Sequence, residues 1–169
     1  MCCGLKRALL TLLPSLRAYA FCLTLDRWHA DALVHSSLVE IWSKHQGERG
    51  HALKIAAFSV VRHQFLRQGI VDPISPTLGG QRVPEGEDVF RTRFMRLPRT
   101  AREALSLTEV WGFTMGQAAE ICGCDQETIG RRVTMVYRDL TSQISRPFPF
   151  DLIKINRSRG PGVSCAAWV

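Results

Sequence analysis

One segment in the C-terminal half most constrains how this chain can fold, because it contains two helical patterns separated by only a few residues. Two helices that cross steeply need a small residue at the crossing, a glycine with positive φ in the turn, and a branched apolar residue on the inner face of the second helix. Ala119, Gly123 and Ile129 supply these three residues at offsets of four and six. The spacing therefore predicts a helix-turn-helix over residues 114–144, although an ordinary helical hairpin is also compatible with it.

The ends of the two predicted helices agree with this interpretation. Thr114 and Gln117 form a capping-box pair, and Asp125 stands where it can cap the second helix. In a DNA-binding helix-turn-helix the outer face of the second helix enters the major groove, with base contacts near its N-terminal end. The residues predicted to contact DNA there are Gln126, Thr128, Arg131 and Arg138, with Gly130 and Thr134 on the same outer face. Arg132 is also predicted to contact DNA, although its position can equally face the neighbouring helix.

Composition and cysteine usage narrow the function further. The net charge of +7 and the pI near 9.5 favour a polyanionic partner. The six cysteines follow no disulfide spacing, and no metal-ligand set, glycine-rich phosphate loop or paired nucleophile and base is present. We therefore predict no catalytic residue, no metal, no cofactor and no enzymatic activity. No apolar run is long enough to cross a membrane, so a cytoplasmic protein without a membrane partner is expected.

The remaining chain reads as two helical units and a linker. Residues 5–70 contain three amphipathic patterns, with a loop at 45–51, and predict a small three-helix bundle. Residues 71–86 hold three prolines and three glycines and predict a flexible linker, whereas 87–146 return to helical patterning. Residues 147–169 show no helical period and predict a disordered tail. The expected fold class is all-α, with two small helical domains joined by a linker.

A series of local motifs, in this order along residues 8–145, resembles the extracytoplasmic-function sigma factors of bacterial RNA polymerase. Single motifs are weak evidence, but their order makes the resemblance strong. They are Leu12-Leu13-Pro14-Ser15-Leu16-Arg17-Ala18-Tyr19-Ala20; Ala30-Asp31-Ala32-Leu33-Val34-His35 with Ile41-Trp42; Phe58-Ser59-Val60-Val61-Arg62-His63; Leu97-Pro98 with Arg102-Glu103-Ala104-Leu105; and Gly112-Phe113-Thr114 with Ala118-Ala119-Glu120-Ile121, Gly123-Cys124, Thr128-Ile129 and Arg132.

The resemblance implies a role for each unit. The bundle at 5–70 would be region two, which binds core RNA polymerase and melts the minus-ten promoter element, and the unit at 87–146 would be region four, which reads the minus-thirty-five element. It also implies promoter DNA and an anti-sigma factor as further partners. The implied residues are Asp31, Leu33 and Val34 for polymerase, and Arg62, His63 and Arg67, beside the loop at 45–51, for the melted strand.

Some positions depart from the family pattern and keep two alternatives open. Ala32, Ser36 and His29 stand where acids are common on the second helix, and Gly130 costs the reading helix roughly 1 kcal/mol relative to alanine. A diverged sigma factor accounts for these changes. So does a sigma-like mimic that binds an anti-sigma factor. A helix-turn-helix regulator with an unrelated N-terminal bundle is a third interpretation, and it predicts a palindromic duplex site.

Overall fold

The computed structural model describes residues 2–69 and 89–142, and within them all regular structure is helical, as predicted. The predicted linker at 71–86 and tail at 147–169 lie outside the described residues. In chain order the helices are α1 (Cys2–Thr24), α2 (Arg27–Lys44), α3 (Gly50–Arg67), α4 (Val89–Arg96), α5 (Arg99–Leu105), the π-helix η1 (Ser106–Val110), α6 (Met115–Cys122) and α7 (Gln126–Ser142).

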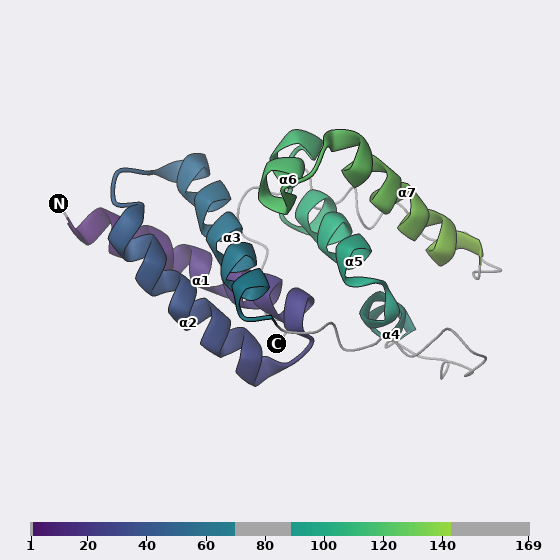
Figure 1. The fold of residues 1–169 in the computed structure, drawn as a ribbon, viewed down its shortest axis with the longest axis horizontal. Coiled ribbons are helices and arrows are strands. Elements are labelled where there is room, and N and C mark those ends of the chain that lie inside the picture. The colour runs from purple at the N-terminus through teal and green to yellow at the C-terminus, as the bar shows by residue number, and fades with distance from the viewer. Residues whose placement is uncertain (1, 70–88, 143–169) are drawn as a thin grey trace.

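Helices α1, α2 and α3 form the predicted N-terminal bundle (Figure 1). Leu16, Tyr19 and Leu23 lie on one stripe of α1 and are fully buried, as their helical spacing predicts. The side chain of Asp26 caps α2 by accepting a hydrogen bond from the His29 amide at 2.8 Å. The bundle is therefore built from the amphipathic patterns that the sequence displays.

The C-terminal helices surround α5, and a short π-helix closes the turn that follows α5. The Trp111 amide donates to the carbonyl of Ser106, five residues earlier, at 3.1 Å. This wider turn ends the predicted helix and places Trp111 in the interior, where it is buried. Helices α6 and α7 then follow as the helix-turn-helix.

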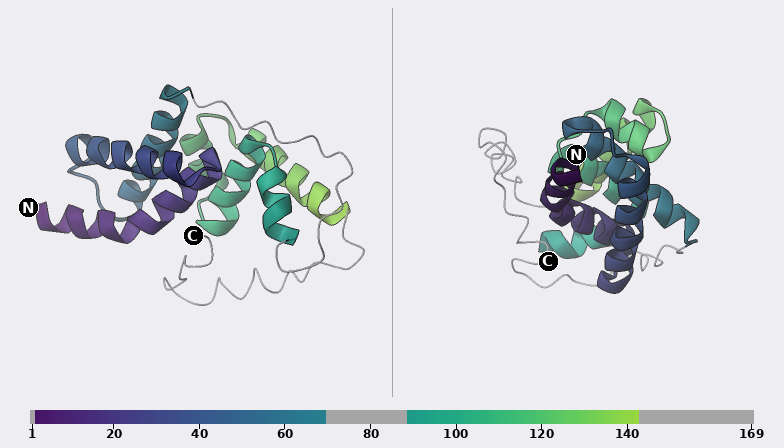
Figure 2. Two further views of the ribbon diagram at one scale, coloured as in Figure 1. Left: turned by 90° about the horizontal axis from the view of Figure 1, so that it is seen from below. Right: turned by 90° about the vertical axis from the view of Figure 1, so that its left-hand side faces the viewer.

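The two helical units pack directly on each other and share one continuous hydrophobic core (Figures 1 and 2). The ring of Phe58 on α3 lies 5.3 Å from the ring of Trp111 and 5.0 Å from that of Phe113, measured between centroids. Tyr19 on α1 also meets Trp111 edge to face at 5.5 Å. Such aromatic pairs stabilise beyond the area they bury. The sequence predicted two compact units, and the structure adds an extensive aromatic contact between them.

Polar contacts hold the same interface. The buried guanidinium of Arg102 on α5 donates to the Cys22 carbonyl of α1 at 2.6 Å and to the Leu97 carbonyl at 2.9 Å. From α3, Lys54 Nζ donates to the Trp111 carbonyl at 2.7 Å and lies 4.5 Å from the centre of the Phe113 ring. Charged donors thus satisfy carbonyl groups at the ends of helices that would otherwise lose their hydrogen bonds to water on burial.

Candidate nucleic-acid and polymerase interfaces

The helix-turn-helix has the geometry that its sequence predicts. Thr114 Oγ1 accepts a hydrogen bond from the Gln117 amide at 3.2 Å, and Gln117 Oε1 accepts one from the Thr114 amide at 2.9 Å. These two bonds complete the capping box of α6. Gly123 ends α6 in the left-handed region, with φ of 56°, which a residue without a Cβ adopts at little cost.

Asp125 caps α7 and fixes where the predicted reading helix begins. Its carboxylate accepts hydrogen bonds from the Thr128 amide at 2.7 Å and from the Thr128 hydroxyl at 2.8 Å. Hydrogen bonds from the side chain and backbone of Thr128 lower the pKa of Asp125. Ile129 is fully buried on the inner face of α7, and Ala119 is buried on α6. The crossing therefore leaves the opposite face of α7 open.

That outer face of α7 carries a shallow hollow, hereafter the α7 hollow, which brings two of the predicted DNA-binding residues together. Its lining consists of Glu127, Gly130, Arg131, Thr134, Met135 and Arg138. Arg131 is exposed, and its Nη2 donates to Thr128 Oγ1 at 3.1 Å. Sequence reasoning did not assign Glu127 or Met135 to a site, although their spacing from Arg131 and Thr134 along a helix would place them beside these residues.

The other predicted residues of α7 lie at the edge of this face. Gln126 is exposed at the first position of the helix. The hydroxyl of Thr128 is engaged in the cap and by Arg131, so its position is fixed within the protein. Arg132 is only partly exposed, and its Nη1 lies 3.8 Å from Cys124 Sγ in the turn. Arg132 therefore contacts the neighbouring turn, one of the two environments its position allows.

In the N-terminal bundle, Arg62 points into the interface between the two units. Its Nε donates to Glu103 Oε1 on α5 at 3.0 Å, and the two side chains are 17% and 0% exposed. Tyr19 also donates to Glu103 Oε1, at 2.8 Å. Burial, and then the Glu103 carboxylate, raise the pKa of Tyr19 well above its usual range, so the hydroxyl remains the donor. Arg62 is thus held by a buried carboxylate in this arrangement.

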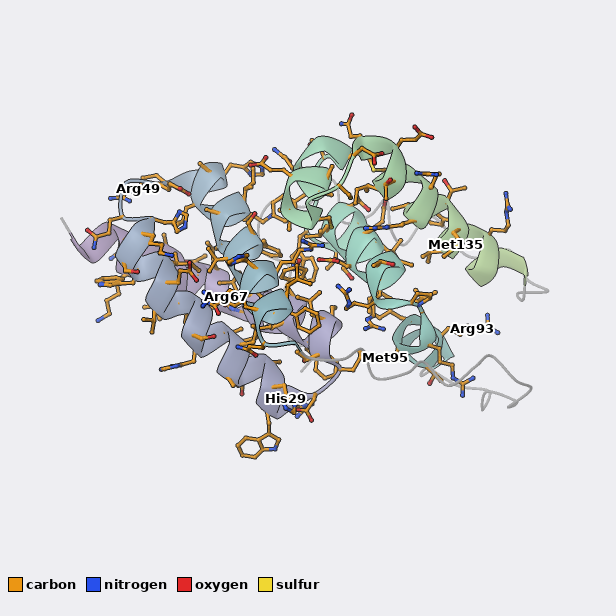
Figure 3. All side chains as sticks on the ribbon, viewed as in Figure 1. His29, Arg49, Arg67, Arg93, Met95 and Met135 are labelled. Atoms are coloured by element: carbon orange, nitrogen blue, oxygen red, sulfur yellow. The ribbon has the colours of Figure 1, made fainter. Side chains whose placement is uncertain are left out.

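The remaining cations predicted to contact the melted strand are free of that interface. His63 and Arg67 are both exposed on α3, and Arg67 is labelled in Figure 3. In the loop that precedes α3, His45 Nδ1 lies 2.8 Å from Glu48 Oε1, and Arg49 donates to the Gln46 carbonyl at 2.6 Å. The structure therefore does not gather Arg62, His63 and Arg67 into one exposed patch.

The residues predicted to bind polymerase separate into exposed and buried ones. Asp31 is exposed on α2 and forms a two-pronged ion pair with Arg17 of α1, at 2.7 and 2.8 Å. Leu33 and Val34 are core residues, 0% and 3% exposed. Their side chains offer no surface to a partner in this arrangement, because the motif on which the resemblance rests coincides with the buried stripe of α2. A polymerase contact by Leu33 and Val34 stays a prediction, and in this arrangement both side chains belong to the core of the bundle.

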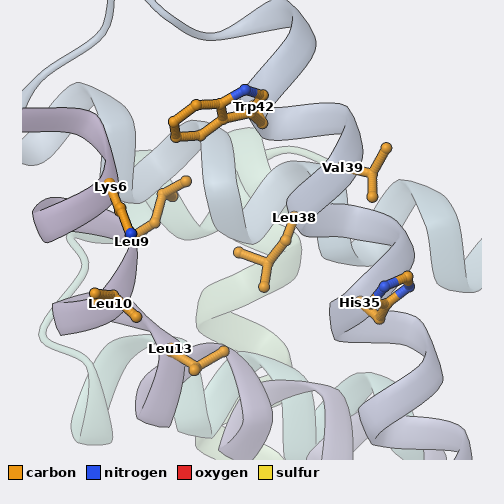
Figure 4. Close-up of a pocket in the computed structure, with 8 residues that line it drawn as sticks. All are labelled: Lys6, Leu9, Leu10, Leu13, His35, Leu38, Val39 and Trp42. Carbon is orange, nitrogen blue, oxygen red and sulfur yellow. The ribbon is translucent and has the colours of Figure 1, made fainter. Parts of the chain in front are cut away.

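An apolar groove lies between the N-terminal part of α1 and the C-terminal part of α2 (Figure 4). Leu10, Val39 and Trp42 in its lining are exposed apolar side chains. Lys6 and His35 are the polar residues among the described residues that line it, and none of these is acidic. The groove extends the exposed face of α2 that carries Asp31. Sequence reasoning missed it because it requires the register of two helices.

Other kinds of site find no support in the described ranges. There, no group of three or more His, Cys, Asp or Glu side chains could hold a metal ion. No described helix is both long and apolar enough to span a membrane. Burial raises the pKa of the Cys22 thiol to about 11 and that of the Cys122 thiol to about 12, so both are protonated at neutral pH.

The fold and the two surfaces define a class: an all-α protein with an N-terminal three-helix bundle packed on a helix-turn-helix unit. No protein-family model matches the chain. The chain is 31% identical, over 152 residues, to the ECF RNA polymerase sigma factor EcfG of Rhodopseudomonas palustris strain TIE-1. The match covers 82% of this chain and 84% of EcfG. The chain therefore belongs to the extracytoplasmic-function sigma factor family of RNA polymerase.

Two solved structures share the fold. The sigma factor RpoE from Bartonella quintana, in complex with the anti-sigma factor NepR, is 28% identical with a TM-score of 0.65, covering 84% of this chain and 98% of that chain. The anti-anti-sigma factor PhyR of the same organism, complexed with NepR, is 21% identical with a TM-score of 0.55, covering 90% of this chain and 59% of that chain. The second likeness concerns the fold alone.

Proposed function

We propose that this protein directs transcription initiation by binding core RNA polymerase and recognising promoter DNA through its two helical units. The observation that carries the proposal is the helix-turn-helix of a sigma-family chain whose α7 leaves Arg131 exposed on its outer face. Exposed arginines on such a face suit phosphate contacts and the acceptor edges of guanine. In this function α7 reads the minus-thirty-five element through Arg131 and Arg138 on its outer face. Gln126, Thr128 and Arg132 contribute at the edge of that face.

The N-terminal bundle would bind the melted minus-ten strand through α3. His63 and Arg67 are exposed for this purpose. Arg62 can join them only after leaving Glu103, so we propose that the two units separate when the protein acts on a promoter. A single strand is held by cations along its backbone and by pockets for unstacked bases, which the loop before α3 can border.

Core polymerase would bind the exposed face of α2. Asp31 lies one helical turn before His35, which lines the apolar groove between α1 and α2. Exposed apolar side chains such as Val39 and Trp42 suit a protein partner, because isolated monomers seldom leave a contiguous apolar patch uncovered. An anti-sigma factor is the second proposed partner, since the related sigma factor RpoE was solved in complex with one.

Run-off transcription tests this function directly. The purified chain is added to bacterial core polymerase on a library of promoter fragments, and transcripts are sequenced. We expect discrete start sites that depend on the chain, and weaker transcription from the Arg131→Ala variant at the same promoters. Absence of any chain-dependent start site, together with no binding to core polymerase, would reject the proposal.

The alternative is a sigma-like mimic that binds an anti-sigma factor without initiating transcription. Two observations support testing this alternative. Ala32 and Ser36 replace acids that are common in the family on the second helix. The fold is also shared with an anti-anti-sigma factor. The mimic predicts tight binding to an anti-sigma protein and no chain-dependent transcript. Promoter-directed transcripts in the assay above would remove it.

A further inference from the structure

Gly130 stands in the interior of α7, where neither its backbone conformation nor its neighbours in the described part of the chain require a glycine. Its backbone is not in the left-handed region, unlike that of Gly123. Among the residues that the structure describes, a Cβ built on Gly130 would have no neighbouring atom within 4 Å, whereas one built on Gly116 would lie 3.0 Å from Gln126 Nε2. Glycine in a helix interior is less stable than alanine by roughly 1 kcal/mol. Packing within the described ranges therefore does not account for glycine at this position.

The position of Gly130 on α7 suggests that a binding partner, rather than the chain itself, requires a glycine here. Gly130 forms part of the α7 hollow, between Glu127 and Thr134, which are one turn away on either side. Arg131 and Arg138 line the same hollow. We propose that Gly130 is a positioning residue for DNA reading: the missing side chain lets the edge of a base pair in the major groove approach the backbone of α7. This inference rests on the proposed function.

The mixed charge around the hollow suits a base-pair edge, which presents hydrogen-bond donors as well as acceptors. The carboxylate of Glu127 is exposed beside Gly130 and would repel a phosphate, but it can accept a hydrogen bond from the amino group of cytosine. Met135, labelled in Figure 3, adds an apolar side chain suited to the methyl group of thymine. Arg131 and Arg138 line the same hollow, and arginine also suits contacts to the phosphates beside a base pair.

This assignment predicts that the stability of α7 and its affinity for DNA change in opposite directions when Gly130 is replaced by alanine. Replacing Gly130 by alanine should stabilise α7, because alanine is the better helix former and the space is open. The same methyl group would hold the base-pair edge away from the helix and weaken DNA binding. A leucine at this position would fill the hollow and weaken binding further. A purely structural role for Gly130 predicts no such opposite signs.

The experiment uses the full chain assembled with core polymerase, and duplexes that the wild-type holoenzyme selects from a randomised library. Affinity for the selected duplexes and thermal unfolding of the free chain are measured for Gly130→Ala and Gly130→Leu. Matched controls are Gly4→Ala and Gly4→Leu, because Gly4 is also helical and open but lies in α1. We expect affinity to fall about tenfold for alanine and about 100-fold for leucine, the range lost with one or two base contacts.

Three outcomes are informative. A higher unfolding temperature with weaker duplex binding for Gly130→Ala, and unchanged binding for the Gly4 variants, supports the inference. If both Gly130 variants bind like wild type while Arg131→Ala binds weakly, the inference is overturned and the proposed function stands. If the wild-type holoenzyme selects no duplex beyond those that core polymerase retains alone, both are rejected.

Discussion

At the scale of single residues, Glu103 is where the polar contacts between the two units converge. Its carboxylate is fully buried and accepts hydrogen bonds from Tyr19 of α1 and Arg62 of α3, and Arg99 Nη1 lies 3.8 Å away. A buried ion pair adds little net stability when complete, because desolvation offsets the attraction. Removal of one partner, however, leaves an uncompensated charge. Loss of Glu103 or of one of its partners would therefore disturb the packing of the two units on each other.

We expect Glu103→Ala to destabilise the folded chain by about 3–5 kcal/mol, because it strands the mostly buried Arg62 guanidinium. Urea unfolding monitored by circular dichroism measures the change. Tyr19→Phe removes only one hydrogen bond and should cost about 1 kcal/mol. Exposed Glu120 on α6 provides the control, Glu120→Ala, which should be near neutral. A Glu103→Ala chain as stable as this control would contradict the buried contact between Arg62 and Glu103.

At the scale of elements, the two helices of the helix-turn-helix depend on caps that involve only neighbouring residues. We expect Thr114→Ala to destabilise the chain by about 1 kcal/mol, because both hydrogen bonds of the capping box lose their geometry. Thr114→Ser keeps the hydroxyl and should remain close to wild type. Equal loss in the two variants, measured by urea unfolding, would show that the hydroxyl contributes nothing.

The cap of α7 makes the stability of that helix depend on acidity. The pKa of Asp125 is lower in the folded chain than its ordinary value of 3.8, chiefly because Thr128 donates two hydrogen bonds to the carboxylate. A lowered folded pKa means that the cap contributes fully above the unfolded pKa and is lost as pH falls through the folded value.

Between about pH 5 and pH 2 we therefore expect the Thr128 amide to lose protection from hydrogen exchange. Asp125→Asn caps without titrating, so protection of the Thr128 amide in that variant should depend less on pH over the same range. Identical pH profiles for the two chains would argue against Asp125 as the titrating cap.

At the scale of the whole molecule, one core spans both helical units, and this determines how the chain unfolds. Phe58 of α3 is fully buried against Trp111 and Phe113. We expect a single calorimetric transition whose calorimetric and van't Hoff enthalpies agree. Phe58→Ala should lower the free energy of unfolding by about 3–5 kcal/mol. Two separate transitions in the wild-type chain would show that the units are independent in solution.

Local features of the fold could be predicted from the sequence because each depends on residues a few positions apart. Asp26, Thr114 and Asp125 cap the helices that follow them, and Gly123 adopts the positive φ that the turn requires. The buried stripe of α1 follows from the 3.6-residue period. The same period could not separate Leu33 and Val34 as core residues from residues of a contact motif, because both patterns occupy the same positions of α2.

The tertiary structure alone decided which buried faces meet. Tyr19 and Glu103 are 84 positions apart, and Arg62 and Glu103 are 41 apart. Amphipathic periodicity predicts that one face of a helix is buried, but it does not identify the residues that cover this face. The sequence by itself thus determined the helices, their caps and the helix-turn-helix. Long-range packing, which sequence spacing does not encode, decided that Arg62 is held by Glu103 and that α7 keeps its outer face open.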